Sequence, residues 1–216
     1  MRTDLRPGLY AITDVTPERD PEFVLTTAQQ VLAGGAVLLQ YRDKVNTIDV
    51  RRSLAQGLLE LCRAHRVPLI VNDDVELATA VGADGVHLGK NDGSVEAARA
   101  RLGNRIIGVS CYNDFSRAVA AERAGADYVA FGRFFVSATK PSAAQAEVSL
   151  IERAKAELAV PVVAIGGITA ANASTLLHAG VDLVAVVHAV FGAPEPAAAA
   201  RRFAHLFECR NRTAAL

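Results

Sequence analysis

The sequence alternates between short, continuously apolar runs and longer segments in which Ala, Leu, Arg and Glu recur at helical spacing. Runs that are apolar throughout, rather than at every second residue, are typical of parallel strands buried on both faces. Eight such runs are found: Leu9–Thr13, Val37–Tyr41, Leu69–Val71, Gly85–Leu88, Ile106–Val109, Tyr128–Phe131, Val162–Ile165 and Leu183–Val187. This alternation predicts a parallel α/β fold.

The segments between the runs predict helices at Phe23–Leu32, Val50–His65, Val95–Leu102, Ser116–Ala124, Ser149–Leu158, Ala171–His178 and Pro196–Phe207. A weak repeat built on Gly34-Gly35, Gly82, Gly125 and Gly180 precedes every second strand, where Gly suits the left-handed residue that ends a helix. The repeat favours a closed (β/α)8 TIM barrel over an open doubly wound sheet, with residues 1–216 as a single domain. No Gly-x-Gly-x-x-Gly follows the first strand, which weakens a dinucleotide-binding interpretation.

Charge and cysteine content exclude several classes of partner. Lys and Arg number 23, and Asp and Glu also number 23, so the basic excess that nucleic acid or an anionic membrane requires is lacking. No stretch approaches the roughly 20 apolar residues of a membrane span. Cys62, Cys111 and Cys209 have neither disulfide-framework nor metal-site spacing. We therefore expect a cytoplasmic protein with structural cysteines.

Polar side chains follow the second strand. In a barrel of this kind the active face lies at the carboxyl ends of the strands. Gln40, Arg42 and Lys44 alternate, so in an extended chain they point to the same side, and an amide with two cations suits an oxyanion attached to a polar ring. A solvated loop is the alternative, but Gln40 at the end of an apolar strand needs a partner.

Acidic residues follow the third and fourth strands. Asn72-Asp73-Asp74 comes directly after Leu69–Val71, and Asp92 follows the fourth strand. Asp74 suits the N-cap of a helix beginning just after it, at Val75–Ala80, and Asp92 could cap the helix near Ser94–Leu102. Carboxylates beside a cationic oxyanion site would repel the ligand unless a hard cation lay between them. Asp73 and Asp92 are therefore candidate Mg²⁺ ligands, with substrate phosphates completing the shell.

Two further segments suggest anion contacts. Arg133–Glu147 is the longest irregular segment, and Ser137, Thr139 and Lys140 within it could surround a diphosphate as a lid. Gly166-Gly167 follows the seventh strand, where exposed backbone N–H groups could bind a second phosphate. A mobile surface loop and a plain turn are the respective alternatives.

The histidines do not form a catalytic set with Ser, Cys or Asp. His65, His178 and His205 fall on predicted helices, and His87 is interpreted as a structural residue with satisfied hydrogen bonds. His188 follows the eighth strand and could contact the second phosphate.

These motifs together resemble thiamine-phosphate synthases. The matching segments, in order along nearly the whole chain, are Tyr10-Ala11-Ile12-Thr13-Asp14, Gln40-x-Arg42-x-Lys44, Asn72-Asp73-Asp74, Gly85-Val86-His87-Leu88-Gly89 with Asp92, Gly108-Val109-Ser110, Thr139-Lys140-Pro141 and Ala164-Ile165-Gly166-Gly167-Ile168. The resemblance implies a TIM-barrel enzyme that joins hydroxymethylpyrimidine diphosphate to thiazole phosphate and releases diphosphate.

The resemblance also implies residue roles. It assigns Gln40, Arg42, Lys44 and Asn72 to the pyrimidine diphosphate, Asp73 and Asp92 to Mg²⁺, Ser110, Ser137, Thr139 and Lys140 to the diphosphate or the joining substrates, and Gly167, Val187 and His188 to the thiazole phosphate. Arg42, Lys44, Ser110 and Lys140 would act in catalysis.

The sequence departs from the family pattern at three places. Ser137 replaces the more usual Thr and keeps a hydroxyl, whereas His188 replaces the usual Ser, and Phe134-Phe135 replaces a small or Pro-containing pair. A thiazole phosphate tautomerase on the same barrel is one alternative, although it needs no diphosphate site. A non-catalytic phosphate-ligand regulator is another. The expected partners are small-molecule substrates, and association into a homo-oligomer is compatible with the sequence.

Overall fold

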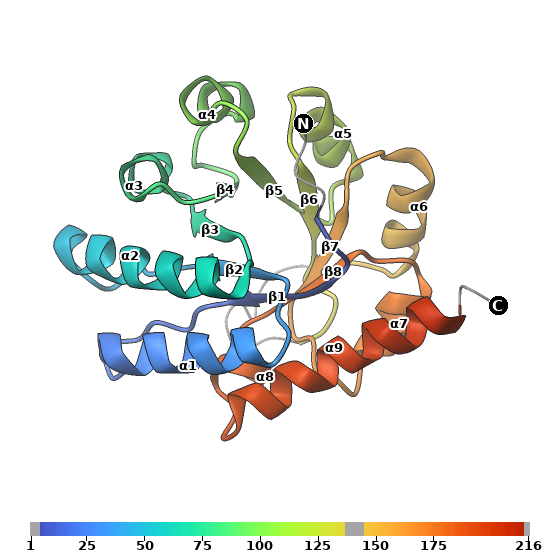
Figure 1. Cartoon of the computed structure of the whole chain (residues 1–216). Helices are drawn as coiled ribbons and strands as arrows, with labels where there is room; N and C mark the ends of the chain where they lie inside the picture. The colour runs from blue at the N-terminus through green and yellow to red at the C-terminus, as the bar shows by residue number, and fades with distance from the viewer. Residues whose placement is uncertain (1–4, 137–144, 214–216) are drawn as a thin grey trace.

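Eight parallel strands close into a barrel in the order β1 to β8 in the computed structural model, which describes residues 5–136 and 145–213 (Figure 1). The strands are β1 (Gly8–Ile12), β2 (Leu38–Tyr41), β3 (Leu69–Asn72), β4 (Gly85–Leu88), β5 (Ile106–Tyr112), β6 (Tyr128–Phe131), β7 (Val162–Ile165) and β8 (Leu183–Val186). β8 pairs with β1 as well as with β7, and this pairing closes the sheet. The predicted TIM barrel is confirmed.

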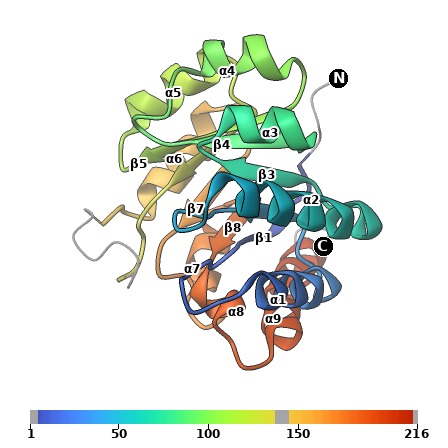
Figure 2. The ribbon, with the colours of Figure 1, turned by 90° about the vertical axis from the view of Figure 1, so that its left-hand side faces the viewer.

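The helices cover the outside of the barrel (Figures 1 and 2). They are α1 (Pro21–Ala33), α2 (Ile48–His65), α3 (Val75–Val81), α4 (Val95–Leu102), α5 (Phe115–Arg123), α6 (Ser149–Glu157), α7 (Ala173–His178), α8 (His188–Phe191) and α9 (Pro196–Thr213). The short α8 was not predicted, because four residues carry no periodic pattern. Within the described chain, no helix is long and apolar enough to cross a membrane.

Two hydrophobic layers stabilise the barrel. The inner layer fills the barrel and consists of Leu5, Tyr10, Ile12, Leu38, Ile70, Ile106, Tyr128, Ala130, Val163, Leu183 and Ala185. The outer layer packs the opposite faces of the strands against the helices. Strands buried on both faces explain why the runs in the sequence are continuously apolar.

β5 extends beyond the predicted end at Val109. It continues to Tyr112, with a register shift against β6 between Ser110 and Tyr112. The polar Ser110 is accommodated within the strand because its hydroxyl meets the His87 imidazole inside the barrel.

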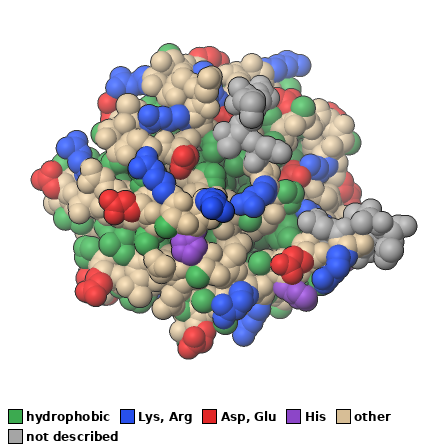
Figure 3. Space-filling model, in the orientation of Figure 1, with side chains coloured by type: hydrophobic (Ala, Val, Ile, Leu, Met, Phe, Trp, Pro, Cys, Tyr) green, Lys and Arg blue, Asp and Glu red, His purple; other side chains and the backbone are tan. Residues whose placement is uncertain are grey.

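The glycine repeat marks the end of the barrel where the strands begin. Gly35, Gly82, Gly125 and Gly180 all have positive φ, as helix-ending residues require. In three of the four copies an Asp follows two residues after the Gly and accepts a hydrogen bond from the first or second backbone N–H of the preceding strand: Asp84 from Leu69, Asp127 from Ile107 and Asp182 from Val162. Figure 3, which views this end, shows basic and acidic side chains interspersed around it.

We expect Asp127→Ala to lower the free energy of unfolding by about 2 kcal/mol, because a buried backbone donor loses its acceptor. The Asp127 carboxylate accepts from Ile107 N at 2.8 Å and from Arg99 Nη2 at 2.6 Å. Urea unfolding followed by circular dichroism measures the change. The control is Glu157→Ala, which breaks an exposed pair with Arg153 and should cost less than about 0.5 kcal/mol. Equal effects of the two variants would contradict the stabilising role of the Asp127 carboxylate as acceptor for Ile107 N.

Candidate active site

A cavity of about 370 Å³ opens at the end of the barrel where the strands finish. It lies between the ends of the strands and the loops that follow them, and polar side chains project over an apolar floor that includes Val163 and Ala185. Seven of the residues predicted from the sequence line it: Gln40, Arg42, Asn72, Ser110, Gly167, Val187 and His188. Residues from five different strands and their loops are thus brought to one cavity.

Hydrogen bonds between the backbone of Arg42 and the Thr13 side chain hold Arg42 at the cavity. Its N–H donates to Thr13 Oγ1 at 2.9 Å, and the Thr13 hydroxyl donates to the Arg42 carbonyl at 3.1 Å. Thr13 is itself buried, so the end of β1 fixes where the segment after β2 turns. Within the described residues the Arg42 guanidinium has no hydrogen-bond partner, which leaves its planar donors available to an anion.

Lys44, Asp73 and Asp92 form a charged cluster beside the cavity. They do not line it, but Asp73 follows directly after the lining residue Asn72. Lys44 Nζ lies 2.5 Å from Asp73 Oδ2, and Asp92 Oδ2 accepts from Gly89 N at 2.8 Å. The cluster therefore unites residues from the loops after β2, β3 and β4.

The two carboxyls of this cluster interact strongly. Burial and the neighbouring Asp73 carboxylate raise the pKa of Asp92 above its ordinary value. The pKa of Asp73 is lowered, since hydrogen bonds from Lys44 and Asp92 outweigh the desolvation that opposes them. Opposite shifts of this kind are expected of two carboxyls that share one site.

The donor set fits a magnesium ion held jointly by protein and substrate. Among residues 5–136 and 145–213, no group of three or more His, Cys, Asp or Glu could hold a metal alone. Two carboxylates are nevertheless what Mg²⁺ usually takes from a protein when phosphate oxygens and water supply the other ligands. Asp73 and Asp92 therefore suit a metal that binds together with a diphosphate.

The capping roles of the three acids divide clearly. Asp74 is the N-cap of α3 and accepts from Leu77 N at 2.8 Å, as predicted. The alternative that Asp92 caps the next helix is wrong, because Ser94 caps α4 through Ala97 N. Asp73 has a φ of +64°, a strained conformation that directs its carboxylate toward Lys44 rather than toward α3.

The loop that carries Lys44 is organised by Asp43, which the sequence did not single out. The buried Asp43 carboxylate accepts from Tyr41 Oη, Val45 N, Asn46 N and Asn46 Nδ2, at 2.8 to 3.0 Å. Burial opposes ionisation, but the bonds from Asn46, Val45 and Tyr41 outweigh it and lower the pKa of Asp43. Asp43 thus shapes the turn that places Lys44 beside Asp73.

We expect Asp43→Asn to lower the free energy of unfolding by roughly 2 kcal/mol at neutral pH, because a charged acceptor of several bonds is lost. A lowered folded-state pKa stabilises the protein above the unfolded value of about 3.9, and this contribution disappears as pH falls through the folded pKa. The difference between wild type and variant should therefore shrink in acid, which unfolding titrations at several pH values would measure. If the difference in unfolding free energy between wild type and variant did not change with pH, the ionised Asp43 carboxylate would not be the source of the stabilisation.

Gly166 and Gly167 bring the end of β7 close to the segment after β6. Their φ values are +103° and +65°, and a Cβ at either would overlap the backbone or side chains of Arg133 to Val136. Phe135 N donates to the Gly166 carbonyl, and Asn172 Nδ2 donates to the Gly167 carbonyl. Glycine is required here for close approach, and the predicted contact of Gly167 with a phosphate stays a prediction.

His188 begins α8 at the rim of the cavity. Its Nε2 lies 3.7 Å from Asp14 Oδ2, and that carboxylate also pairs with Arg19 at 2.6 Å. Asp14 lines the cavity as well. This end of the site therefore combines an imidazole with a carboxylate, and Arg133 also lines the cavity.

Three predicted contacts, Ser137, Thr139 and Lys140, lie outside the described residues. The same holds for most of the segment interpreted as a lid. Their roles rest on the sequence motif.

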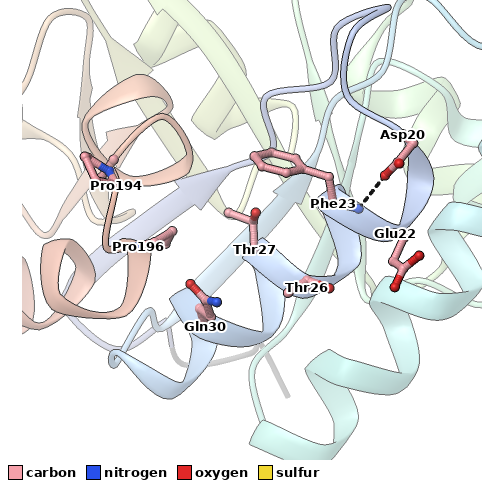
Figure 4. A pocket seen from close by; sticks show the side chains of 9 residues that line it. Asp20, Glu22, Phe23, Thr26, Thr27, Gln30, Pro194 and Pro196 are labelled. Carbon is pink, nitrogen blue, oxygen red and sulfur yellow. Dashed lines mark hydrogen bonds between the residues drawn. The ribbon is translucent and has the colours of Figure 1, made fainter.

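A second cavity of about 400 Å³ lies between α1 and the segment that joins α8 to α9 (Figure 4). It is lined by Asp20, Glu22, Phe23, Thr26, Thr27, Gln30, Ala193, Pro194 and Pro196. Its charged lining residues are both acidic, and Asp20 caps α1 through Phe23 N at 2.7 Å. This chemistry does not suit a phosphorylated ligand, whereas that of the barrel cavity does.

Sequence analysis did not identify the polar groups beneath the barrel cavity. Tyr10 and Tyr128 lie inside the barrel with their hydroxyls 2.7 Å apart, and His87 contacts both Tyr128 and Ser110. The prediction that His87 has satisfied hydrogen bonds is confirmed, but the side chain also lines the cavity. The available signal was the presence of Tyr and His in otherwise aliphatic strands.

The cysteines do not belong to this site. Burial raises the pKa of the Cys62 thiol to about 12 and that of the Cys111 thiol to about 12, so neither is an activated nucleophile. None of the three cysteines forms a disulfide.

Comparison with known proteins gives consistent matches. Residues 9–190 match the thiamine monophosphate synthase family. A thiamine-phosphate synthase of Thiobacillus denitrificans is 52% identical over 201 residues, covering 93% of this chain and 94% of the relative. One of Methylococcus capsulatus is 52% identical over 202 residues, covering 93% and 89%.

Solved structures agree. A thiamine phosphate pyrophosphorylase from Pyrococcus furiosus superposes with a TM-score of 0.86 at 33% identity, over 95% of this chain and 98% of that one. A 3-hexulose-6-phosphate synthase, at 20% identity and a TM-score of 0.68 over 92% and 99% of the two chains, shares the fold.

Proposed function

The chain belongs to the thiamine monophosphate synthase family, and we infer from this membership that it is a transferase with thiamine-phosphate synthase activity, acting in thiamine biosynthesis. We propose 4-amino-2-methyl-5-hydroxymethylpyrimidine diphosphate and 4-methyl-5-(2-phosphoethyl)thiazole as its substrates. The products would be thiamine phosphate and diphosphate.

The observation that carries this proposal is the cluster of Lys44, Asp73 and Asp92 beside a cavity lined by Gln40 and Arg42. Two carboxylates next to two cations bind a small anion well only if a divalent cation joins them. A diphosphate with Mg²⁺ gives the cations an anion to bind and the carboxylates a metal to bind. A phosphate without a metal would be repelled by the two carboxylates.

The proposed reaction is a dissociative displacement. The bond between the pyrimidine methylene carbon and the diphosphate oxygen breaks, and its electron pair leaves with the diphosphate. The thiazole nitrogen then donates its lone pair to the methylene cation and forms the new carbon–nitrogen bond. Mg²⁺, when bound, would neutralise charge that develops on the leaving diphosphate.

The protein residues would act by placement and charge. Asp73 and Asp92 would hold the metal, Arg42 and Lys44 would bind diphosphate oxygens, and Gln40 and Asn72 would orient the pyrimidine. Ser110 would contact the substrates where they join. Because no proton transfer to the protein is needed, electrostatic stabilisation and proximity would supply the rate enhancement.

The thiazole phosphate would bind at the opposite side of the cavity. Gly167, Val187 and His188 line that side. Backbone N–H groups after β7 and β8 are a common phosphate site in such barrels. By the family motif, Ser137, Thr139 and Lys140 would complete the diphosphate contacts.

The test is to mix the purified protein with both substrates and Mg²⁺ and to measure thiamine phosphate and diphosphate by chromatography. We expect equimolar products that disappear with chelator and return with Mg²⁺. A tautomerase would act on the thiazole precursor despite chelator, and a regulator would bind ligand without releasing diphosphate. Either result, or no product from folded protein, would refute the proposal.

We also propose a reducing, cytoplasmic setting, which is supported by three cysteines that form no disulfide.

A further inference from the structure

Five polar side chains from five neighbouring or facing strands form one continuous hydrogen-bonded chain inside the barrel. Gln40 Nε2 donates to Tyr10 Oη at 2.6 Å, and Tyr10 Oη lies 2.7 Å from Tyr128 Oη. Tyr128 Oη lies 2.9 Å from His87 Nδ1, and His87 Nε2 lies 2.8 Å from Ser110 Oγ. The chain begins and ends at residues that line the active-site cavity, Gln40 and Ser110.

The middle of this hydrogen-bonded chain is tightly packed and excluded from water. Tyr10 is 1% exposed and Tyr128 is fully buried. The Tyr128 ring stacks on His87 and meets Tyr10 edge to face. Gly108 of β5 pairs with Tyr128, and a Cβ at Gly108 would overlap the Tyr128 ring. The glycine therefore makes room for the phenol inside the barrel.

Counting protons gives this chain a direction. Burial raises the pKa of both phenols, so each hydroxyl keeps its single proton. With Gln40 Nε2 donating to Tyr10, the arrangement that uses every proton within the hydrogen-bonded chain has Tyr10 donating to Tyr128 and Tyr128 donating to His87 Nδ1. A neutral His87 then carries its proton on Nε2 and donates it to Ser110 Oγ.

The direction determines what each end offers to a ligand. Ser110 already accepts from His87, so its hydroxyl proton is left to donate. Within the described residues the Gln40 carbonyl oxygen accepts no hydrogen bond, so it is left to accept. The cavity therefore presents an acceptor and a donor held in fixed orientations.

We propose that Tyr10, Tyr128 and His87 are positioning residues that orient Gln40 and Ser110 for an aminopyrimidine ring. Such a ring has amino N–H donors and ring-nitrogen acceptors, which complement the two ends. This inference rests on the proposed substrate, and it adds that the orientation of the two groups facing the ring is set by the hydrogen-bonded residues behind them, of which Tyr128 lies wholly beneath the cavity lining.

The first experiment reads the proton direction without any substrate. Nitrogen NMR of protein with ring-labelled histidine, at a pH well above the ordinary histidine pKa, distinguishes the two neutral tautomers; the His87→Gln variant assigns the signal among five histidines. We expect His87 to be protonated on Nε2. Tyr128→Phe should abolish this preference, whereas Tyr10→Phe should keep it, because Tyr128 can still donate to His87. Protonation on Nδ1, or the same result in both variants, would overturn the proposal.

The second experiment measures binding of the pyrimidine diphosphate by calorimetry, which requires no turnover. Loss of one buried hydrogen bond should raise its Kd roughly tenfold in Tyr10→Phe and in Tyr128→Phe, with the Kd for thiazole phosphate within about twofold of wild type. The control Leu38→Val truncates a buried residue inside the barrel that does not belong to the hydrogen-bonded chain. It should leave both Kd values unchanged.

Unchanged pyrimidine binding in both Tyr variants, or an equal weakening for both substrates, would overturn the positioning role. Failure of the proposed function is distinguishable, since it would leave the wild-type protein without product whatever tautomer His87 adopts. If Tyr128→Phe does not fold, the wild-type tautomer and Tyr10→Phe still decide the question.

Discussion

Asp92→Asn is expected to lower kcat for thiamine phosphate formation by a factor on the order of 10² to 10³ without unfolding the protein, because one of two carboxylates available to Mg²⁺ is lost. Asp92 is the better choice of the pair, since the Lys44–Asp73 ion pair remains intact in this variant. The neutral amide can still accept from Gly89 N, so the loop after β4 keeps its anchor. Diphosphate release at saturating substrates measures the effect.

Dependence on metal gives this prediction a second readout. The Mg²⁺ concentration that supports half-maximal rate should rise in Asp92→Asn. The matched control is Asp49→Asn on the exposed first turn of α2, which should behave as wild type. Full activity of Asp92→Asn, or an unchanged requirement for Mg²⁺, would show that this carboxylate does not hold the metal.

Arg42→Gln is expected to lower kcat/KM for the pyrimidine diphosphate about 100-fold. A guanidinium that lines the cavity would lose charge-assisted bonds to the diphosphate, and such bonds contribute about 1.5–3 kcal/mol. Arg42→Lys should be intermediate, because it retains the charge but not the planar pair of donors. Steady-state kinetics with each substrate varied in turn measures the effect.

Backbone anchoring makes Arg42 a clean test. Thr13 holds the main chain of residue 42, so a change of side chain should leave the loop in place. Arg52→Gln on the exposed face of α2 is the control. A rise in KM for the thiazole phosphate alone would place Arg42 at the other substrate and contradict the assignment.

The sequence predicted the strands well because parallel strands buried on both faces are encoded locally. Continuous apolar runs located all eight. Three of them, Gly85–Leu88, Tyr128–Phe131 and Val162–Ile165, match the predicted bounds to the residue, and four more agree within one residue at either end. The Asp74 cap and the helix-ending glycines are local as well, because a cap acts on N–H groups only three residues away. The extension of β5 was missed because its register shift against β6 depends on a neighbouring strand.

The candidate site was predicted as a set of positions and not as a set of contacts. Polar residues after each strand identified Arg42, Asn72 and His188, because strand ends in a barrel share one face. Asp92 could be interpreted as a cap until Ser94 was seen to cap α4. In the sequence, Asp43 looked like part of a solvated loop. In the structure its carboxylate is buried beneath that loop.

By itself, then, the sequence determined the barrel, the positions of its strands and the polar residues around its mouth, since these follow from apolar continuity and short-range hydrogen bonding. Tertiary structure alone decided which side chains meet. Lys44 and Asp73 are 29 residues apart and Tyr10 and Tyr128 are 118 apart, yet both pairs are in contact. In strands buried on both faces, the sequence does not show which residues point into the barrel. Closure of the sheet settles that direction, and with it the chain of hydrogen bonds beneath the cavity.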